Sequence, residues 1–189
     1  MSTQTQRSML LVFLAAILVV PVTMGVTRRL QTQSGPTGRL AVIGQVTVNG
    51  TSAISGATVF SDSTVTTAQN SSAVVSLGKL GRVEVMPSSN TKLTFSDTSI
   101  HAAMLESGRV RVSSSSGVTG GATTNDGEVV TVGDRMNEFT VDTTCGNTLV
   151  SVKKGTVELR AGNSVKQIAA GGQDTAGTAR PGCTPGGER

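Results

Sequence analysis

The stretch KKGTVELR, residues 153–160, contains the pattern that decides the fold: a glycine followed by two apolar residues with one polar residue between them. This pattern occurs four times, as GQVTV at 44–48, GRVEV at 81–85, GRVRV at 108–112 and GTVEL at 155–159. A period of two places one set of side chains inward and the other in water, as in a half-buried β-strand. Each glycine ends a turn, so the apolar pairs are expected to face one common core.

Other short runs have the same strand character, and turn residues separate them. The additional strand candidates are 41–43, 57–60, 64–67, 73–77, 92–95, 128–132, 138–141, 150–152 and 165–169. The pairs Asn49–Gly50 and Asp126–Gly127 favour tight turns. The polar stretch 113–121, SSSSGVTGG, is predicted to be a loop. The best helical candidate after residue 30, at 101–105, is too short to nucleate alone.

These patterns predict an all-β fold. The four repeats are separated by 37, 27 and 47 residues, which is too uneven for a strict solenoid. We therefore expect an irregular β-roll or two-sheet sandwich of about 10–12 short strands, preceded by one N-terminal hydrophobic helix. The chain has no Trp or Tyr and only four Phe, so the core must be built mainly from Val, Ile, Leu, Met and Ala.

The basic balance does not indicate a nucleic-acid partner. The net charge is +4, but adjacent basic residues occur only at Arg28–Arg29 and Lys153–Lys154. Without Trp or Tyr the chain has almost no platform on which single-stranded bases could stack. A mildly basic, solvated surface is the expected reading.

Residues 9–26, MLLVFLAAILVVPVTMGV, form an uncharged apolar run. As a helix it would be about 27 Å long, close to the thickness of a bilayer core of about 30 Å. Two readings are open: a retained signal-anchor, which we favour, or a signal peptide cut near Gly25. Around it we expect a short tail at 1–8, a linker at 27–39, a β domain at 40–175 and a disordered Gly/Pro-rich tail at 176–189.

Several motifs together resemble the FecR-type domain of bacterial cell envelopes, over roughly residues 40–175. The first motifs are GQVTV followed by Ile54–Gly56, and then a threonine with a serine-containing turn. The likeness continues through the segments at 65–77, 81–95, 105–112, 132–141, 150–159 and 168–174. In one departure from the family's pattern, Gly133 is followed by Asp134 instead of threonine, and Phe139 comes six residues after the glycine.

The resemblance implies an extracytoplasmic β module. Regulators of the FecR type pass a signal from an outer-membrane receptor to a sigma factor through a cytoplasmic N-terminal domain. Here only Met1–Ser8 precede the apolar run, too few residues to fold as such a domain. The expected location is the inner membrane, with one span at 9–26 and the β domain in the periplasm. A secreted or periplasmic protein after signal cleavage is the alternative.

The sequence offers little chemistry. Cys145 and Cys183 are a possible disulfide that would pin the C-terminal tail, and free or intermolecular thiols are the alternative. His101 is the sole histidine and has no recognisable nucleophile motif, so a structural role is favoured over a catalytic one. We expect no catalytic, cofactor-binding or metal-binding residues and no cofactor.

Two functions remain open at this point. The first is a non-catalytic, membrane-tethered module that binds or senses another envelope protein, whose identity the sequence does not give. The second is a structural or surface-assembly protein whose edge strands add to a partner's sheet. An envelope enzyme ranks well behind both, and the oligomeric state stays open.

Overall fold

A computed structural model of the protein describes residues 35–184. The predicted apolar helix at 9–26, the short tail at 1–8, most of the linker and residues 185–189 lie outside the described residues. Within residues 35–184, no helix is long and apolar enough to cross a membrane. The part of the chain that the structure describes is almost entirely β, as predicted.

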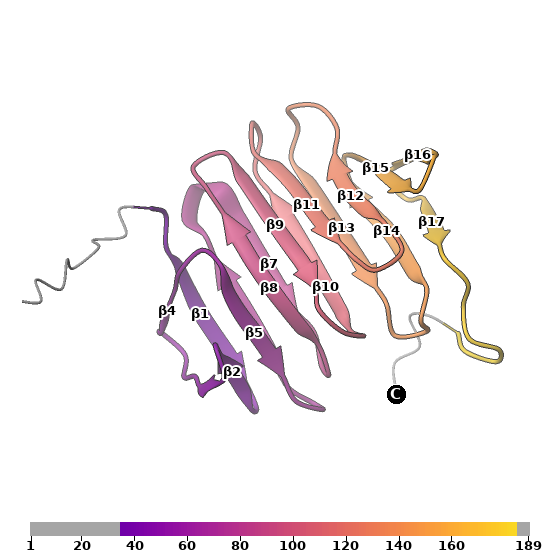
Figure 1. The fold of residues 1–189 in the computed structure, drawn as a ribbon. Coiled ribbons are helices and arrows are strands. Elements are labelled where there is room, and N and C mark those ends of the chain that lie inside the picture. Colours follow the sequence, from indigo (N-terminus) through magenta and orange to yellow (C-terminus); the bar gives the residue numbers. More distant parts are fainter. Residues whose placement is uncertain (1–34, 185–189) are drawn as a thin grey trace, which may run out of the picture. The chain divides into compact units, whose positions relative to one another are not determined.

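The strands form two sheets, which we name sheet A and sheet B (Figure 1). Sheet A contains, in order across the sheet, β4 (Thr58–Val59), β1 (Gly38–Ile43), β6 (Ser72–Ser76), β7 (Gly81–Val85), β10 (Arg109–Ser114), β13 (Asn137–Asp142), β14 (Thr148–Lys154) and β17 (Gln173–Ala176). Sheet B contains β3 (Thr51–Ser52), β2 (Val46–Val48), β5 (Ser63–Thr67), β8 (Asn90–Phe95), β9 (Ser99–Met104), β11 (Thr119–Thr123), β12 (Glu128–Thr131), β15 (Thr156–Ala161) and β16 (Ser164–Ala169).

The chain builds both sheets at once. It passes from β6 and β7 in sheet A to β8 and β9 in sheet B, and then returns to sheet A for β10. The same alternation continues through β11 and β12, β13 and β14, β15 and β16, and finally β17. Neighbouring strands are antiparallel, except that β9 and β11 run parallel. This path is that of an irregular β-roll flattened into a two-sheet sandwich. With seventeen strands among the described residues, it is more finely divided than the expected 10–12.

The valines of the repeats form the core between the sheets, as the alternation predicts. Sheet A has a continuous row of inward side chains, in which each residue is the cross-strand partner of the next. The row consists of Val75, Val83, Val112, Phe139 and Val152. All five are buried. Burying one such side chain contributes about 1.5–3 kcal/mol, so the row is a large part of what holds the sheets together.

The second, third and fourth repeats are buried as expected, and the first is partly exposed. In GQVTV, Val46 is buried but Val48 is only half-buried, because its strand lies near the edge of sheet B. In GTVEL, Val157 and Leu159 are both buried against the opposite sheet.

The prediction of one loop over 113–121 was wrong. β10 extends to Ser114, β11 begins at Thr119, and only four residues connect them. The glycines of β11 belong to a strand because their neighbours leave no room for a side chain. A Cβ at Gly120 would lie 3.1 Å from both Ser114 Oγ and Thr131 Cγ2, and one at Gly121 would lie 2.7 Å from His101 Nδ1. The sequence looks flexible there, but the packing requires small residues.

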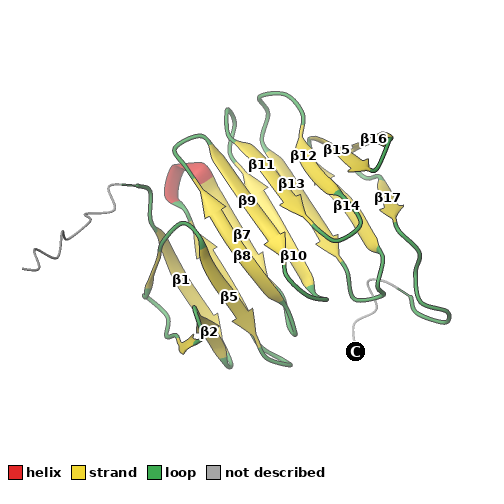
Figure 2. Ribbon diagram, viewed as in Figure 1, coloured by secondary structure: helices red, strands yellow, loops and turns green. Residues whose placement is uncertain are grey.

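The sandwich has two ends, at which the strands turn. The cysteine end carries the turns at 68–71, 86–89, 105–108, 124–127 and 143–147, and it includes Cys145. The opposite end, the η1 end, carries the 3₁₀ helix η1 (Gly78–Leu80) together with the turns at 96–98, 115–118 and 132–136. Figure 2 shows η1 at the opposite end of the strands from the C-terminal segment. β1 begins at the η1 end and runs toward the cysteine end.

Candidate binding groove at the cysteine end

A C-terminal segment, residues 177–184, follows β17 at the cysteine end, and we call it the strap. Its Cys183 Sγ lies 1.97 Å from Cys145 Sγ, the distance of a disulfide bond, with 5.6 Å between the two Cα atoms. Of the pairings left open by the sequence, the structure therefore has the intramolecular one. Cys145 is buried. The bond attaches the strap to the turn between β13 and β14.

Hydrogen bonds hold the strap at the same place as the disulfide. The backbone N–H of Arg180 donates to the carbonyl of Cys145 at 2.9 Å, and its guanidinium donates to the carbonyl of Thr144. Gly177, with φ of 76°, packs so closely on Asp126 that a Cβ there would lie 2.5 Å from the carboxylate. The segment expected to be a disordered tail thus makes specific contacts over residues 177–184.

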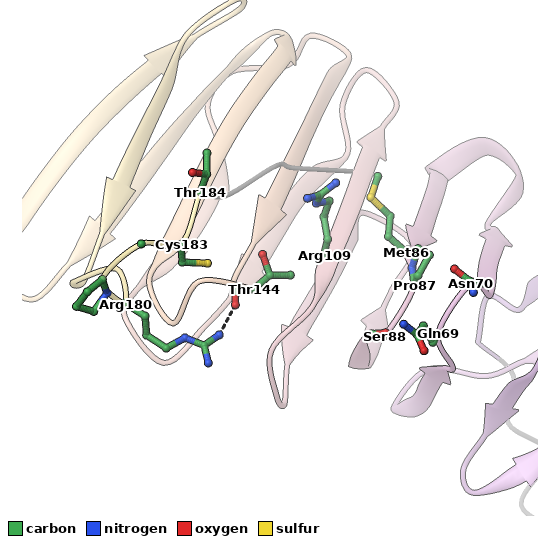
Figure 3. A pocket seen from close by; sticks show the side chains of 12 residues that line it. Gln69, Asn70, Met86, Pro87, Ser88, Arg109, Thr144, Arg180, Cys183 and Thr184 are labelled. Atoms are coloured by element: carbon green, nitrogen blue, oxygen red, sulfur yellow. Dashed lines mark hydrogen bonds between the residues drawn. The ribbon is translucent and has the colours of Figure 1, made fainter. Parts of the chain in front are cut away.

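The strap forms one wall of a groove with a volume of about 1110 Å³ (Figure 3). The opposite wall consists of Gln69 and Asn70 from the β5–β6 turn and of residues 86–88 from the β7–β8 turn. Arg109 and Thr144 lie between the two walls. The groove is therefore built from segments that are far apart in sequence and meet only in the folded sandwich.

Two residues of the far wall have backbones that few side chains adopt. Asn70 has φ of 59° and Ser88 has φ of 53°, both in the left-handed region. Asparagine tolerates this conformation well, whereas serine does so less often. These residues form tight turns, and their side chains are exposed at the tips.

The charge of Arg109 is neutralised within the fold. Its Nε and Nη2 donate to Asp142 Oδ2 at 2.9 and 2.8 Å. The other carboxylate oxygen, Asp142 Oδ1, accepts hydrogen bonds from the backbone N–H and the hydroxyl of Thr144, at 2.9 and 2.6 Å. Because Asp142 is almost fully buried, this network fixes the bottom of the groove and leaves little net charge there.

The rest of the lining offers unused polar groups. Among the described residues, the side chains of Gln69, Asn70, Ser88 and Thr184 form no hydrogen bond. Amide and hydroxyl groups both donate and accept, so they match the alternating N–H and C=O groups of a polypeptide backbone. The groove is suited to hold an extended segment of another chain.

A smaller cavity of about 300 Å³ lies beside the groove and shares Arg180 with it. Its lining includes the carboxylates of Glu106 and Asp126. Arg180 forms no ion pair with a described residue, so it is the one cation of the groove that a partner's carboxylate could approach.

Three acids of the sandwich form ion pairs within the fold. Glu84 pairs with Arg111 on the outer face of sheet A, and Asp142 pairs with Arg109. Glu158 lies on the outer face of sheet B, where hydrogen bonds from Arg160 and then Gln167 lower the pKa of its carboxyl.

His101 lies away from the groove, on the outer face of sheet B. Its Nε2 is 2.7 Å from Thr123 Oγ1, and its ring lies over Gly121. Burial lowers the pKa of its imidazole, and the nearby Glu128 carboxylate partly opposes that shift. The imidazole thus fills the space left by the missing side chain of Gly121, its cross-strand partner.

Sequence reasoning missed the groove residues because they belong to turns without a periodic pattern. The sequence identified Cys145 and Cys183, and the disulfide places them at one wall. The signal for the other wall was weak: Asn70 in the polar stretch at 68–72 reads only as a turn.

No protein-family model and no curated protein matches the chain. Its fold is similar to that of a candidate anti-sigma factor from Parabacteroides distasonis ATCC 8503, in two crystal structures at 1.65 and 2.50 Å resolution. Each comparison gives a TM-score of 0.50 and 17% sequence identity, and covers 65% of this chain. The match spans 57% of the length of the other chain. At this level of identity the likeness concerns the fold alone.

Proposed function

We propose that this protein is a non-catalytic, FecR-like interaction or sensing module that works outside the cytoplasm, tethered to the inner membrane by residues 9–26. The observation that supports it best is the groove at the cysteine end. Its walls present free amide and hydroxyl groups at exposed turn tips, and a disulfide fixes the strap that closes it. Such a rigid, polar surface is suited to binding a protein segment.

The disulfide favours a location outside the cytoplasm. Bonds of this kind persist in the periplasm and in secreted proteins, and they are rare where thiols are kept reduced. Both cysteines of the chain are used in this one bond. The location agrees with the apolar run at 9–26, which in either of its readings directs the β domain across the membrane.

Two further observations support a regulatory role. The sequence motifs resemble the FecR-type domain, and the fold is similar to that of the candidate anti-sigma factor from Parabacteroides distasonis. We propose that the domain recognises an envelope protein through the groove.

The experiment is photo-crosslinking in cells from a single position in the groove. A photoreactive residue in place of Asn70 is expected to give one adduct of constant mass. The same residue in place of Asp97 is the matched control, because Asp97 is an exposed turn residue at the η1 end. The double variant Cys145→Ser/Cys183→Ser should weaken the Asn70 adduct at least several-fold, since the strap is released.

Equal adducts from Asn70 and Asp97 would show that the groove is not the partner site. A ladder of adducts with multiples of the chain's own mass, from a probe at Val165, would favour the second function, surface assembly. The strand that such an assembly would use is β16, an edge strand of six residues that pairs only with β15. Assembly through β16 would give ladders from a probe at Val165 and none from Asn70.

A further inference from the structure

The cations of sheet A differ in whether a carboxylate neutralises them. Four of them are paired: Arg109 with Asp142 at 2.8 Å, Arg111 with Glu84 at 3.0 Å, and Lys153 and Lys154 with Glu138 at 3.2 and 3.8 Å. At the η1 end, Arg135 in the turn at 132–136 forms no ion pair with any described residue. Three further cations there, around β1 and the β6–β7 turn, form none either: Arg39, Lys79 and Arg82. We name these three residues the basic patch.

The register of sheet A places the basic patch on one face. Arg39 of β1 is the partner of Ser76, and Ser76 is the partner of Arg82 of β7. The two arginines are therefore two strands apart on the outer face, about 10 Å at the usual strand spacing. Lys79 lies in η1, the turn that joins β6 to β7. All three side chains are exposed.

Neither Arg39 nor Arg82 has a carboxylate as a cross-strand neighbour. The cross-strand partners of Arg39 and Arg82 are Thr58, Ser76 and Ser113, all uncharged. The nearest acid along β7, Glu84, is already bound to Arg111. The patch is thus a local concentration of unpaired positive charge, whereas each other cation of sheet A lies in an ion pair.

The basic patch lies where the chain enters the domain. Gly38 begins β1 at the η1 end, one residue before Arg39. In the sequence, Arg28 and Arg29 precede this point and follow directly after the apolar run at 9–26. Between that run and Gly38 lie only the eleven residues 27–37.

We infer that the basic patch binds anionic lipid headgroups at the surface of the membrane that holds the tether. The inference rests on the proposed membrane tether. Cations are attracted to an anionic lipid surface only within about one Debye length, about 8 Å at physiological salt, so the patch must be held near the surface. The contact would turn the η1 end toward the lipid and the groove, at the opposite end, away from it.

The test uses the full chain in lipid nanodiscs and hydrogen exchange of the segment 77–82. In discs that contain phosphatidylglycerol, exchange of this segment should be several-fold slower than in discs of phosphatidylcholine alone. High salt should abolish the difference. The variant Arg39→Gln/Arg82→Gln should abolish it too, whereas Lys92→Gln/Arg160→Gln, which removes two exposed cations of sheet B, should retain it.

The outcomes separate the two proposals. A chain that fails to enter nanodiscs would refute the tether and with it the proposed function. A chain that enters the discs but exchanges equally in both lipids would refute only the lipid contact. Slower exchange that survives Arg39→Gln/Arg82→Gln, or is lost equally in the Lys92→Gln/Arg160→Gln control, would also overturn the assignment to the basic patch.

Discussion

The middle strands β7 and β10 and the edge strand β16 have the same alternating sequence pattern, but they differ in how many of their side chains are buried. In β7 and β10 the inward valines Val83, Val85, Val110 and Val112 are fully buried. On the outer face of these strands an ion pair of 3.0 Å joins Glu84 to Arg111. In β16 only Ile168 is buried, and Val165 is 60% exposed. Alternation alone therefore does not determine whether a strand lies within a sheet or ends it.

The difference lies in what occupies the inward positions of β16. By register, Lys166 faces the same side as Leu159 of β15, which is the core side. Its Nζ lies 2.7 Å from Asp174 Oδ1 of β17, so an ion pair joins the edge strands of the two sheets. Hydrogen bonds from Lys166 and from the backbone of Thr175 lower the pKa of the Asp174 carboxyl. A further strand on this edge would have to bury that pair, which is costly.

The largest expected effect comes from a comparison of two added charges, one on the core side of β15 and one on the outer face of β16. Val157→Asp puts an unpaired carboxylate into the core and should cost more than about 3 kcal/mol of the free energy of unfolding. Val165→Asp, on the outer face of the adjacent strand, should change it by less than about 0.5 kcal/mol. Urea unfolding of both variants measures the difference. Equal unfolding midpoints for the two would mean that the two faces are not distinct.

The sequence was sufficient for the core but not for the pairing of the strands. The repeats predicted which side of each strand is buried, because a period of two depends only on local geometry. The sequence pattern did not distinguish strand β11 from a loop, because Gly120 and Gly121 look flexible in the sequence. Only in the folded protein do Ser114, Thr131 and His101 pack around these glycines. Their role depends on contacts with residues that are distant in the chain.

The groove could not be predicted for a related reason. Its walls come from turns around Asn70 and Ser88 and from the strap at 177–184. Nothing periodic connects these segments, and their convergence depends on the alternation of the chain between the sheets. Only the two cysteines gave a signal, and their pairing stayed open because spacing alone does not distinguish a bond from free thiols.

The next effect tests whether Lys166 limits the sheet. Lys166→Leu removes the inward charge and leaves an apolar, exposed edge strand, so copies of the chain should associate through β16. The free energy of unfolding should change by less than about 1 kcal/mol, because the ion pair is partly exposed. Sedimentation of the full chain in a mild detergent measures the association. The control is Lys92→Leu, since β8 already has a neighbour on each side; association of both variants alike would mean that β16 is not a special edge.

The smallest expected effect contrasts the titration of the middle of the sandwich with that of its edge. Burial lowers the pKa of His101 below its ordinary value of 6.5, so the folded state favours the neutral imidazole. The contribution of His101 to the free energy of unfolding is complete above pH 6.5 and is lost as the pH falls through the lowered pKa. The contribution of Asp174 is lost only below the ordinary carboxyl pKa of 3.8.

The variant His101→Gln removes the first titration and keeps a side chain able to hydrogen-bond Thr123. Between pH 7 and pH 5 the wild type should therefore lose less than about 1 kcal/mol relative to this variant. Urea unfolding at a series of pH values measures the effect. A ring that is packed over Gly121 and partly removed from water cannot take up a proton without a cost in the free energy of unfolding. Parallel curves for the two proteins would therefore mean that the imidazole is solvated.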